Sequence, residues 1–154
     1  MMYKKILVAI DGSEIAAHAL EHAINLSKCI QSELRAIYVV DCPTVFFSGS
    51  FYDPSLLQNA FIEEGSLVTT QAQKIFDQAG IKGDTQIVDT QGGHDIVGAI
   101  SRAATDWMAE CVVLGTHGRR GVQRALLGST AEAFLRITNV PVLLIREQAP
   151  TVAD

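Results

Sequence analysis

CVVLGTHGRRGVQRALLGSTAE, residues 111–132, is the stretch that decides the fold. Its first part, Cys111 to Leu114, is a continuous apolar run, which is typical of a strand covered on both faces. The run stops at Gly115, and a loop rich in glycine and arginine follows until Gly128 and Ser129 open a helical pattern. Such a loop is the usual way to hold a phosphate, because small residues let the backbone approach and the N–H groups of a helix N-terminus point at the anion. The stretch therefore predicts a phosphate site between a buried strand and a helix.

Strands and helices alternate along the rest of the chain. The expected strands are 6–10, 34–40, 85–88, 112–114 and 142–145. The first expected helix follows the N-cap residue Ser13 and stops near Cys29, the second is 56–79, the third follows Gly92-Gly93 and carries apolar residues from Ile96 to Trp107 on one face, and the last is 129–138. Because helices connect successive strands, the sheet is expected to be parallel and covered on both faces. We therefore expect a single α/β domain, residues 1–148, with a short C-terminal tail at 149–154. Its predicted architecture is a Rossmann-like three-layer sandwich with a five-stranded parallel sheet, in strand order 3-2-1-4-5, and four helices.

Three segments that are far apart in the sequence lie at the carboxyl ends of predicted strands. They are Asp11, residues 39–41 and residues 115–118. In an open parallel sheet, ligands bind beyond the carboxyl ends of the strands, at the point where the strand order reverses. The sequence therefore predicts that these segments meet at one crevice.

Composition excludes several classes of function. The formal net charge of −5 argues against nonspecific binding of nucleic acid, which requires a basic face. Three cysteines, an odd number at spacings that match no zinc motif, indicate a reduced, cytoplasmic protein. No apolar run approaches the ~18 residues that a membrane span needs. We expect a cytoplasmic protein that contacts neither nucleic acid nor membrane.

The glycine spacing is more specific than a generic loop. Gly115-Thr-His-Gly118, nine residues, and then Gly128-Ser129 match neither a Walker A loop nor a dinucleotide-binding fingerprint. Together with VAIDGSE at residues 8–14, this spacing strongly resembles the universal stress protein family. The resemblance extends from Lys5 to about Arg146 and includes NVPVLLI at residues 139–145. In that family, two glycines three apart, nine residues, and then glycine followed by serine or threonine mark the members that bind ATP.

The resemblance implies a role for individual residues. Asp11 is expected to lie against the nucleoside, the backbone of Val39 to read the adenine edge, and the glycine-rich segment to hold ribose and phosphates. Backbone groups, hydroxyls and N–H groups suit these tasks. The complete predicted site consists of Ala9, Asp11, Val39, Gly115, Thr116, His117, Gly118, Arg119, Gly128, Ser129 and Thr130. Arg120 and Arg124 are further cations in the loop, and the sequence gives no basis for ranking them.

The expected ligand is ATP with Mg²⁺, with AMP and cyclic AMP as alternative adenine nucleotides. We expect a regulatory binding module of the stress response, with at most slow hydrolysis, because the sequence shows no base placed at the γ-phosphate beyond the candidates Asp11 and Asp41. An ATPase or nucleotidyl-transfer enzyme on the same scaffold is one alternative. A nucleotide-free interaction protein, in which the glycine loop is only a turn, is the other.

Several motifs also have simpler interpretations. Ser129 and Glu132 match a capping box, which would occupy the serine side chain. Asp11 is equally well explained by capping the turn that follows it. The segment His18-Ala-Leu-Glu-His22 has the order of an inverted zinc-protease motif, but a solvated helix face is the better explanation because no third ligand is evident.

The last predicted strand, 142–145, is apolar on both faces and is expected at a sheet edge, where unpaired backbone groups invite pairing. The resemblance implies a homodimer through this strand. Aromatic residues in the loop 46–52 indicate a lid over the ligand or a partner surface, or a segment tucked under the long helix. Cys111 is expected to be buried, and Cys42 is expected to be the reactive thiol.

Overall fold

The computed structural model describes residues 2–41, 54–90, 93, 95–117 and 127–146 of the 154-residue chain. Several predictions lie outside these residues. They concern the phosphate-loop residues Gly118, Arg119, Arg120 and Arg124, the thiol of Cys42, the aromatic loop 46–52 and the tail 149–154.

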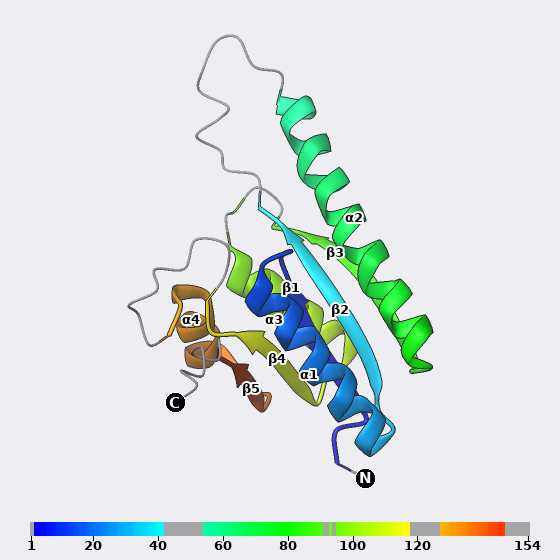
Figure 1. Ribbon diagram of the computed structural model, residues 1–154. Helices are drawn as coiled ribbons and strands as arrows, with labels where there is room; N and C mark the ends of the chain where they lie inside the picture. Colours follow the sequence, from blue (N-terminus) through cyan, green and yellow to red (C-terminus); the bar gives the residue numbers. More distant parts are fainter. Residues whose placement is uncertain (1, 42–53, 91–92, 94, 118–126, 147–154) are drawn as a thin grey trace, which may run out of the picture.

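The sheet has five parallel strands in the order β3-β2-β1-β4-β5. They are β1 (Lys5–Ile10), β2 (Glu33–Val40), β3 (Gly83–Asp89), β4 (Cys111–Gly115) and β5 (Val142–Ile145). Figure 1 shows the strands running the same way, so that their carboxyl ends share one side of the sheet. The predicted strand order and parallel sheet are confirmed.

The four helices found in the described residues cover both faces of the sheet. They are α1 (Glu14–Ile30), α2 (Pro54–Ala79), α3 (Ile96–Trp107) and α4 (Ser129–Ile137). One core cluster joins the sheet to α1 and α2, and contains Phe76 of α2. A second cluster joins the other face to α3 and α4, and contains Phe134 of α4. This is the predicted three-layer sandwich (Figure 1).

The central strands are continuous apolar runs because helices cover both faces of the sheet. In β1, Ile6 and Val8 belong to the core cluster on the α1 and α2 side, whereas Leu7 belongs to the cluster on the opposite side. All three are 0% exposed. A strand with both faces buried has no position for a polar residue, so its sequence shows no alternation.

The edge strand β3 is longer than its sequence predicted. It extends from Gly83 to Asp89 instead of 85–88, and half-buried and exposed residues alternate along most of it. Asp84, near its beginning, accepts two hydrogen bonds of 2.6 Å from the guanidinium of Arg35 on β2. Polar residues therefore belong to this strand, and an apolar run underestimates its length.

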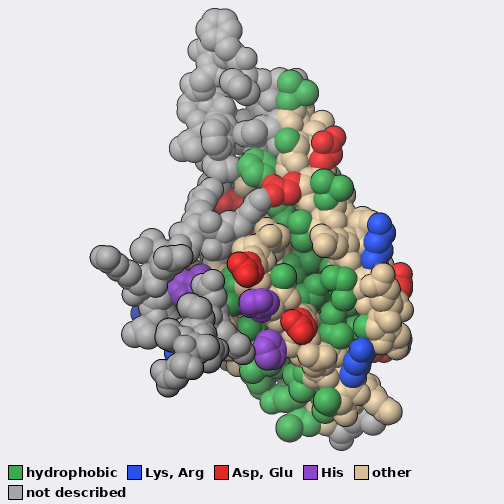
Figure 2. All heavy atoms as spheres, viewed as in Figure 1, with side chains coloured by type: hydrophobic (Ala, Val, Ile, Leu, Met, Phe, Trp, Pro, Cys, Tyr) green, Lys and Arg blue, Asp and Glu red, His purple; other side chains and the backbone are tan. Residues whose placement is uncertain are grey.

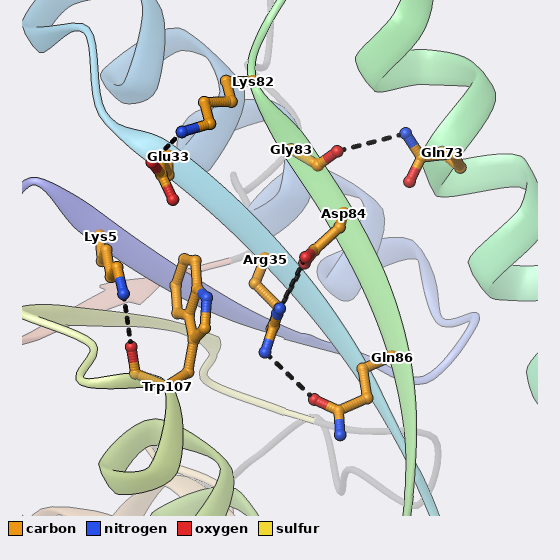
Figure 3. Close-up of polar contacts among 9 residues, drawn as sticks. All are labelled: Lys5, Glu33, Arg35, Gln73, Lys82, Gly83, Asp84, Gln86 and Trp107. Atoms are coloured by element: carbon orange, nitrogen blue, oxygen red, sulfur yellow. Dashed lines mark hydrogen bonds and ion pairs between the residues drawn. The ribbon is translucent and has the colours of Figure 1, made fainter.

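A group of polar contacts joins the elements at the amino ends of the strands (Figure 3). The ring of Trp107, at the end of α3, lies 4.8 Å from the guanidinium carbon of Arg35 and 5.4 Å from the ammonium of Lys5, measured to the ring centroid. The Lys5 ammonium also donates to the Trp107 carbonyl at 3.2 Å. Hydrogen bonding to Asp84 raises the pKa of Arg35, which stays charged. We call Lys5, Arg35, Asp84 and Trp107 together the amino-end clamp. Their contacts hold the end of α3 against β1 and β2.

Candidate functional site

The strand register brings two of the predicted site residues side by side. Ile10 of β1 pairs with Tyr38 of β2, so the residues that follow them, Asp11 and Val39, are neighbours across the two strands. On the other side of β1, Val8 pairs with Val113 of β4, which puts Gly115 beside Ile10. The strand order reverses between β1 and β4. The three segments therefore meet where an open parallel sheet binds its ligands.

The turn after β1 is held by its own side chains. One carboxylate oxygen of Asp11 accepts hydrogen bonds from the backbone N–H of Ser13 at 2.9 Å and from its hydroxyl at 2.5 Å. The Ser13 hydroxyl in turn accepts from the N–H of Ala16 at 3.3 Å, so the predicted N-cap of α1 is confirmed. Gly12, between them, has a φ of +80°, a left-handed conformation that favours glycine. The Asp11 carboxylate thus has the structural role of capping this turn.

The chain leaves β4 along a path fixed by two neighbours. A Cβ at Gly115 would lie 3.0 Å from the Ile15 side chain in the first turn of α1, so glycine lets that turn approach the strand. Thr116, which is only 2% exposed, donates its N–H to the Ile145 carbonyl at the end of β5 at 2.8 Å. Its hydroxyl lies 3.1 Å from Nδ1 of His117. The predicted site residues Thr116 and His117 are therefore anchored beside the strand ends.

Gly128 closes the glycine-rich segment onto this anchor. Its N–H donates to the Thr116 carbonyl oxygen at 2.5 Å. An added Cβ would lie 2.5 Å from that same oxygen and 3.3 Å from the Cα of His117. The protein's own backbone packing therefore requires a glycine here. This contact brings the beginning of α4 against the exit of β4.

The N-cap residue of α4 is not the one that the capping-box interpretation predicts. Its N-cap is Gly128, with φ −70° and ψ 154°, and no side chain caps it with a hydrogen bond. Ser129 is the first helical residue and is exposed. Glu132 instead accepts a hydrogen bond of 2.8 Å from Arg136. The capping-box interpretation is wrong, because the Gly128–Thr116 contact starts the helix one residue earlier than a capping serine would.

The remaining predicted site residues flank these groups. Ala9 and Val39 are half-buried on the α3 and α4 side of the sheet, and Thr130 is half-buried in the first turn of α4. Cys111, as expected, is buried, and burial raises the pKa of its thiol.

The two histidines of the predicted His18-to-His22 motif lie on α1. His18 is half-buried and His22 is exposed, and Figure 2 shows histidine and acidic side chains gathered on the face of the molecule that carries α1. Among the described residues, no group of three or more His, Cys, Asp or Glu side chains lies close enough to hold a metal ion. The described residues that line a separate hollow all belong to α2, and none of them is a predicted site residue; they are Glu63, Ser66, Leu67, Thr70, Gln71 and Lys74.

Sequence reasoning missed one residue at this side of the sheet. Thr90 follows β3 directly and is 4% exposed, and its hydroxyl has no hydrogen-bond partner within the described structure. Its position after the carboxyl end of a strand matches that of Asp11 and Asp41. That shared position is the signal that identifies it.

No helix within the described ranges has both the length and the apolar character that crossing a bilayer requires.

Comparison with known proteins gives consistent matches over nearly the whole chain. Universal stress protein MJ0531 of Methanocaldococcus jannaschii is 32% identical over 146 residues, which cover 95% of this chain and 84% of that protein. A solved structure from the universal stress protein family of Burkholderia pseudomallei is 38% identical, with a TM-score of 0.79, and covers 94% of this chain and 96% of its own.

Two more distant structures share the fold and contain ligands. A universal stress protein in complex with cAMP is 19% identical, with a TM-score of 0.69, and covers 94% of this chain and 98% of its own. The Archaeoglobus fulgidus universal stress protein in complex with dAMP is 20% identical, with a TM-score of 0.67, and covers 94% and 99%. The model of the universal stress protein family matches residues 2–146. The chain is therefore a member of the universal stress protein family.

Proposed function

We propose that this protein binds ATP, together with Mg²⁺, at the carboxyl ends of the strands and acts as a cytoplasmic regulatory module in the stress response. The observation that carries the proposal is the contact between Gly128 and Thr116, which sets the first turn of α4 against the exit of β4. The N–H groups of a first turn have no partner within their helix, and among the described residues no side chain caps this one. The phosphates would lie there, favoured also by the helix dipole.

The adenosine half of the ligand would lie against β1 and β2. Asp11 and Val39 are neighbours in the register, and β1 ends at Ile10, so the backbone of Val39 lies beside the end of β1, where it would read the edge of a base. The relatives solved with cAMP and with dAMP support an adenine nucleotide in this fold. Competition titrations with AMP and cyclic AMP would rank the alternatives to ATP.

The Mg²⁺ ion would arrive with the nucleotide. Mg²⁺ commonly keeps several waters and is held by phosphate oxygens with few protein ligands. When bound, the ion neutralises phosphate charge. Because Asp11 caps its own turn, we propose binding with slow hydrolysis at most, so that nucleotide occupancy is the signal.

The test begins with the purified protein, without added ligand. Denaturation followed by chromatography should release adenine nucleotide, or calorimetry with Mg-ATP should show one site per chain. No released nucleotide and a flat titration would refute the proposal and favour the nucleotide-free interaction protein. Steady phosphate release far above background that is lost in Asp11→Ala would instead favour the enzyme.

We also propose that β5 pairs with the same strand of a second copy. It is an edge strand, and Leu143 on it is 37% exposed. Leu135 and Ile137 of the neighbouring α4 are 41% and 53% exposed. An unpaired edge beside exposed apolar groups favours association. Sedimentation at micromolar concentration should show a dimer that Leu143→Lys weakens, and a wild-type monomer would contradict this.

A further inference from the structure

The hydroxyl of Thr90 is a buried polar group without a partner. Thr90 is 4% exposed, and no hydrogen bond to its Oγ1 exists in the described structure. Buried hydroxyls are nearly always paired, because removing one from water without compensation is unfavourable. An unpaired hydroxyl in this position therefore requires an explanation.

The backbone places Thr90 beside the candidate adenosine site. Its N–H donates to the Val40 carbonyl at 3.2 Å, so it continues the β2–β3 ladder by one residue beyond Asp89. Side chains alternate along a strand, and Val88 packs on the α3 and α4 side of the sheet. Thr90 is therefore expected on that side too. Val88 pairs directly with Val39, the residue proposed to read adenine. Thr90 follows Val88 by two residues, so it lies just beyond that pair toward the carboxyl ends of the strands.

The described residues of the connection from β3 to α3 do not use this hydroxyl. The turn after the strand is closed by backbone groups, since the N–H of Gly93 donates to the Thr90 carbonyl at 3.2 Å. The helix N-terminus is capped by Asp95, whose carboxylate accepts from the N–H of Gly98 at 2.7 Å. Neither the turn nor the cap explains a threonine at position 90.

We propose that the Thr90 hydroxyl is a side-chain contact to the nucleobase. This inference rests on the proposed nucleotide binding. A hydroxyl both donates and accepts, which suits the ring nitrogens and the exocyclic amino group of a purine. A site that pairs a buried hydroxyl with the ligand discriminates against bases that leave it unpaired. Thr90 thus adds a determinant of base specificity to the backbone of Val39.

The experiment compares Thr90→Val, which keeps the shape and removes the hydroxyl, with Thr90→Ser, which keeps the hydroxyl. Calorimetric titrations would use Mg-ATP and, separately, adenosine, which has no phosphates. Thr90→Val should weaken both ligands about 5- to 10-fold, as expected for one neutral hydrogen bond. Thr90→Ser should stay within about twofold of the wild type. The melting temperature of ligand-free Thr90→Val should not fall, because no protein partner is lost.

Ser32 provides a matched control. It is the other buried hydroxyl without a partner among the described residues, is 5% exposed, and lies at the amino end of β2. Ser32→Ala should leave both affinities unchanged.

Four results would overturn the inference. They are equal affinities of the wild type and Thr90→Val, a loss for ATP but not for adenosine, an equal loss in Thr90→Ser, and a lower melting temperature of ligand-free Thr90→Val. If the wild type binds both ligands and any of these results is found, only the role of Thr90 is refuted, and the proposed function stands. A wild type that binds neither ligand refutes the proposed function as well.

Discussion

Ser129→Ala separates two explanations of the serine that opens α4. If Ser129 capped the helix, its loss would destabilise the protein by about 1 kcal/mol, within a range of roughly 0.5–2 kcal/mol. In the structure the N-cap is Gly128, and Ser129 is an exposed first helical residue. Alanine is the better helix former by a few tenths of a kcal/mol. We therefore expect an unchanged or slightly higher free energy of unfolding in urea, and a melting temperature within about 2 °C of the wild type.

Nucleotide affinity should respond in the opposite way. A hydrogen bond from the Ser129 hydroxyl to a charged phosphate is worth about 1.5–3 kcal/mol, which corresponds to roughly a 10- to 150-fold weaker Kd for Mg-ATP in Ser129→Ala. Asp95→Ala is the positive control for capping, because Asp95 does cap α3 through its 2.7 Å bond to the N–H of Gly98. It should lose about 1 kcal/mol of stability in the same urea experiment. A comparable loss in Ser129→Ala would refute the structural reasoning about the helix start, and unchanged affinity would refute the phosphate contact.

Two further substitutions test the packing at opposite ends of the sheet. Gly128→Ala should destabilise the protein by about 1–3 kcal/mol in urea, because its Cβ would lie 2.5 Å from the Thr116 carbonyl oxygen. Wild-type stability would show that this contact is not tight. Arg35→Lys should cost about 1 kcal/mol, since lysine cannot make the two 2.6 Å hydrogen bonds to Asp84 while stacking on Trp107. The estimate is low because the Asp84 side chain is 55% exposed. The same Arg35→Lys substitution would also be made in a Trp107→Leu variant. If it costs as much stability there as in the wild type, the contribution of stacking on Trp107 is refuted.

The central sheet was predictable because burial on both faces leaves a clear pattern. The fifth strand was predicted with its observed bounds, 142–145, and the first within one residue. Prediction was poorer for β3, since an edge strand accepts polar residues such as Asp84 that an apolar run excludes. The approach of Asp11 to Val39 was also predictable, because the carboxyl ends of neighbouring parallel strands lie at the same side of the sheet.

Two features of the candidate site could not be derived from the sequence. The start of α4 depends on the hydrogen bond from Gly128 to Thr116, a tertiary contact that overrides the local Ser129–Glu132 pattern. The burial of Thr90 is the second feature, because a lone threonine after a strand gives no sign that its side chain is buried. Local patterns indicated which residues lie near the strand ends, but the capping and pairing of their side chains needed the folded chain.

The amino-end clamp has a consequence for how this protein can change. β1 spans six residues from Lys5 to Ile10, so the clamp and the candidate site are separated by roughly 16 Å of strand at ~3.3 Å per residue. Substitutions more than about 7–10 Å apart usually have additive effects on stability. Stabilising changes around Trp107 and Arg35 should therefore offset destabilising changes at the strand carboxyl ends without altering ligand specificity. The two ends of the sheet can therefore change almost independently during evolution. Residues at the carboxyl ends can acquire a new ligand specificity while the amino-end clamp keeps the fold stable.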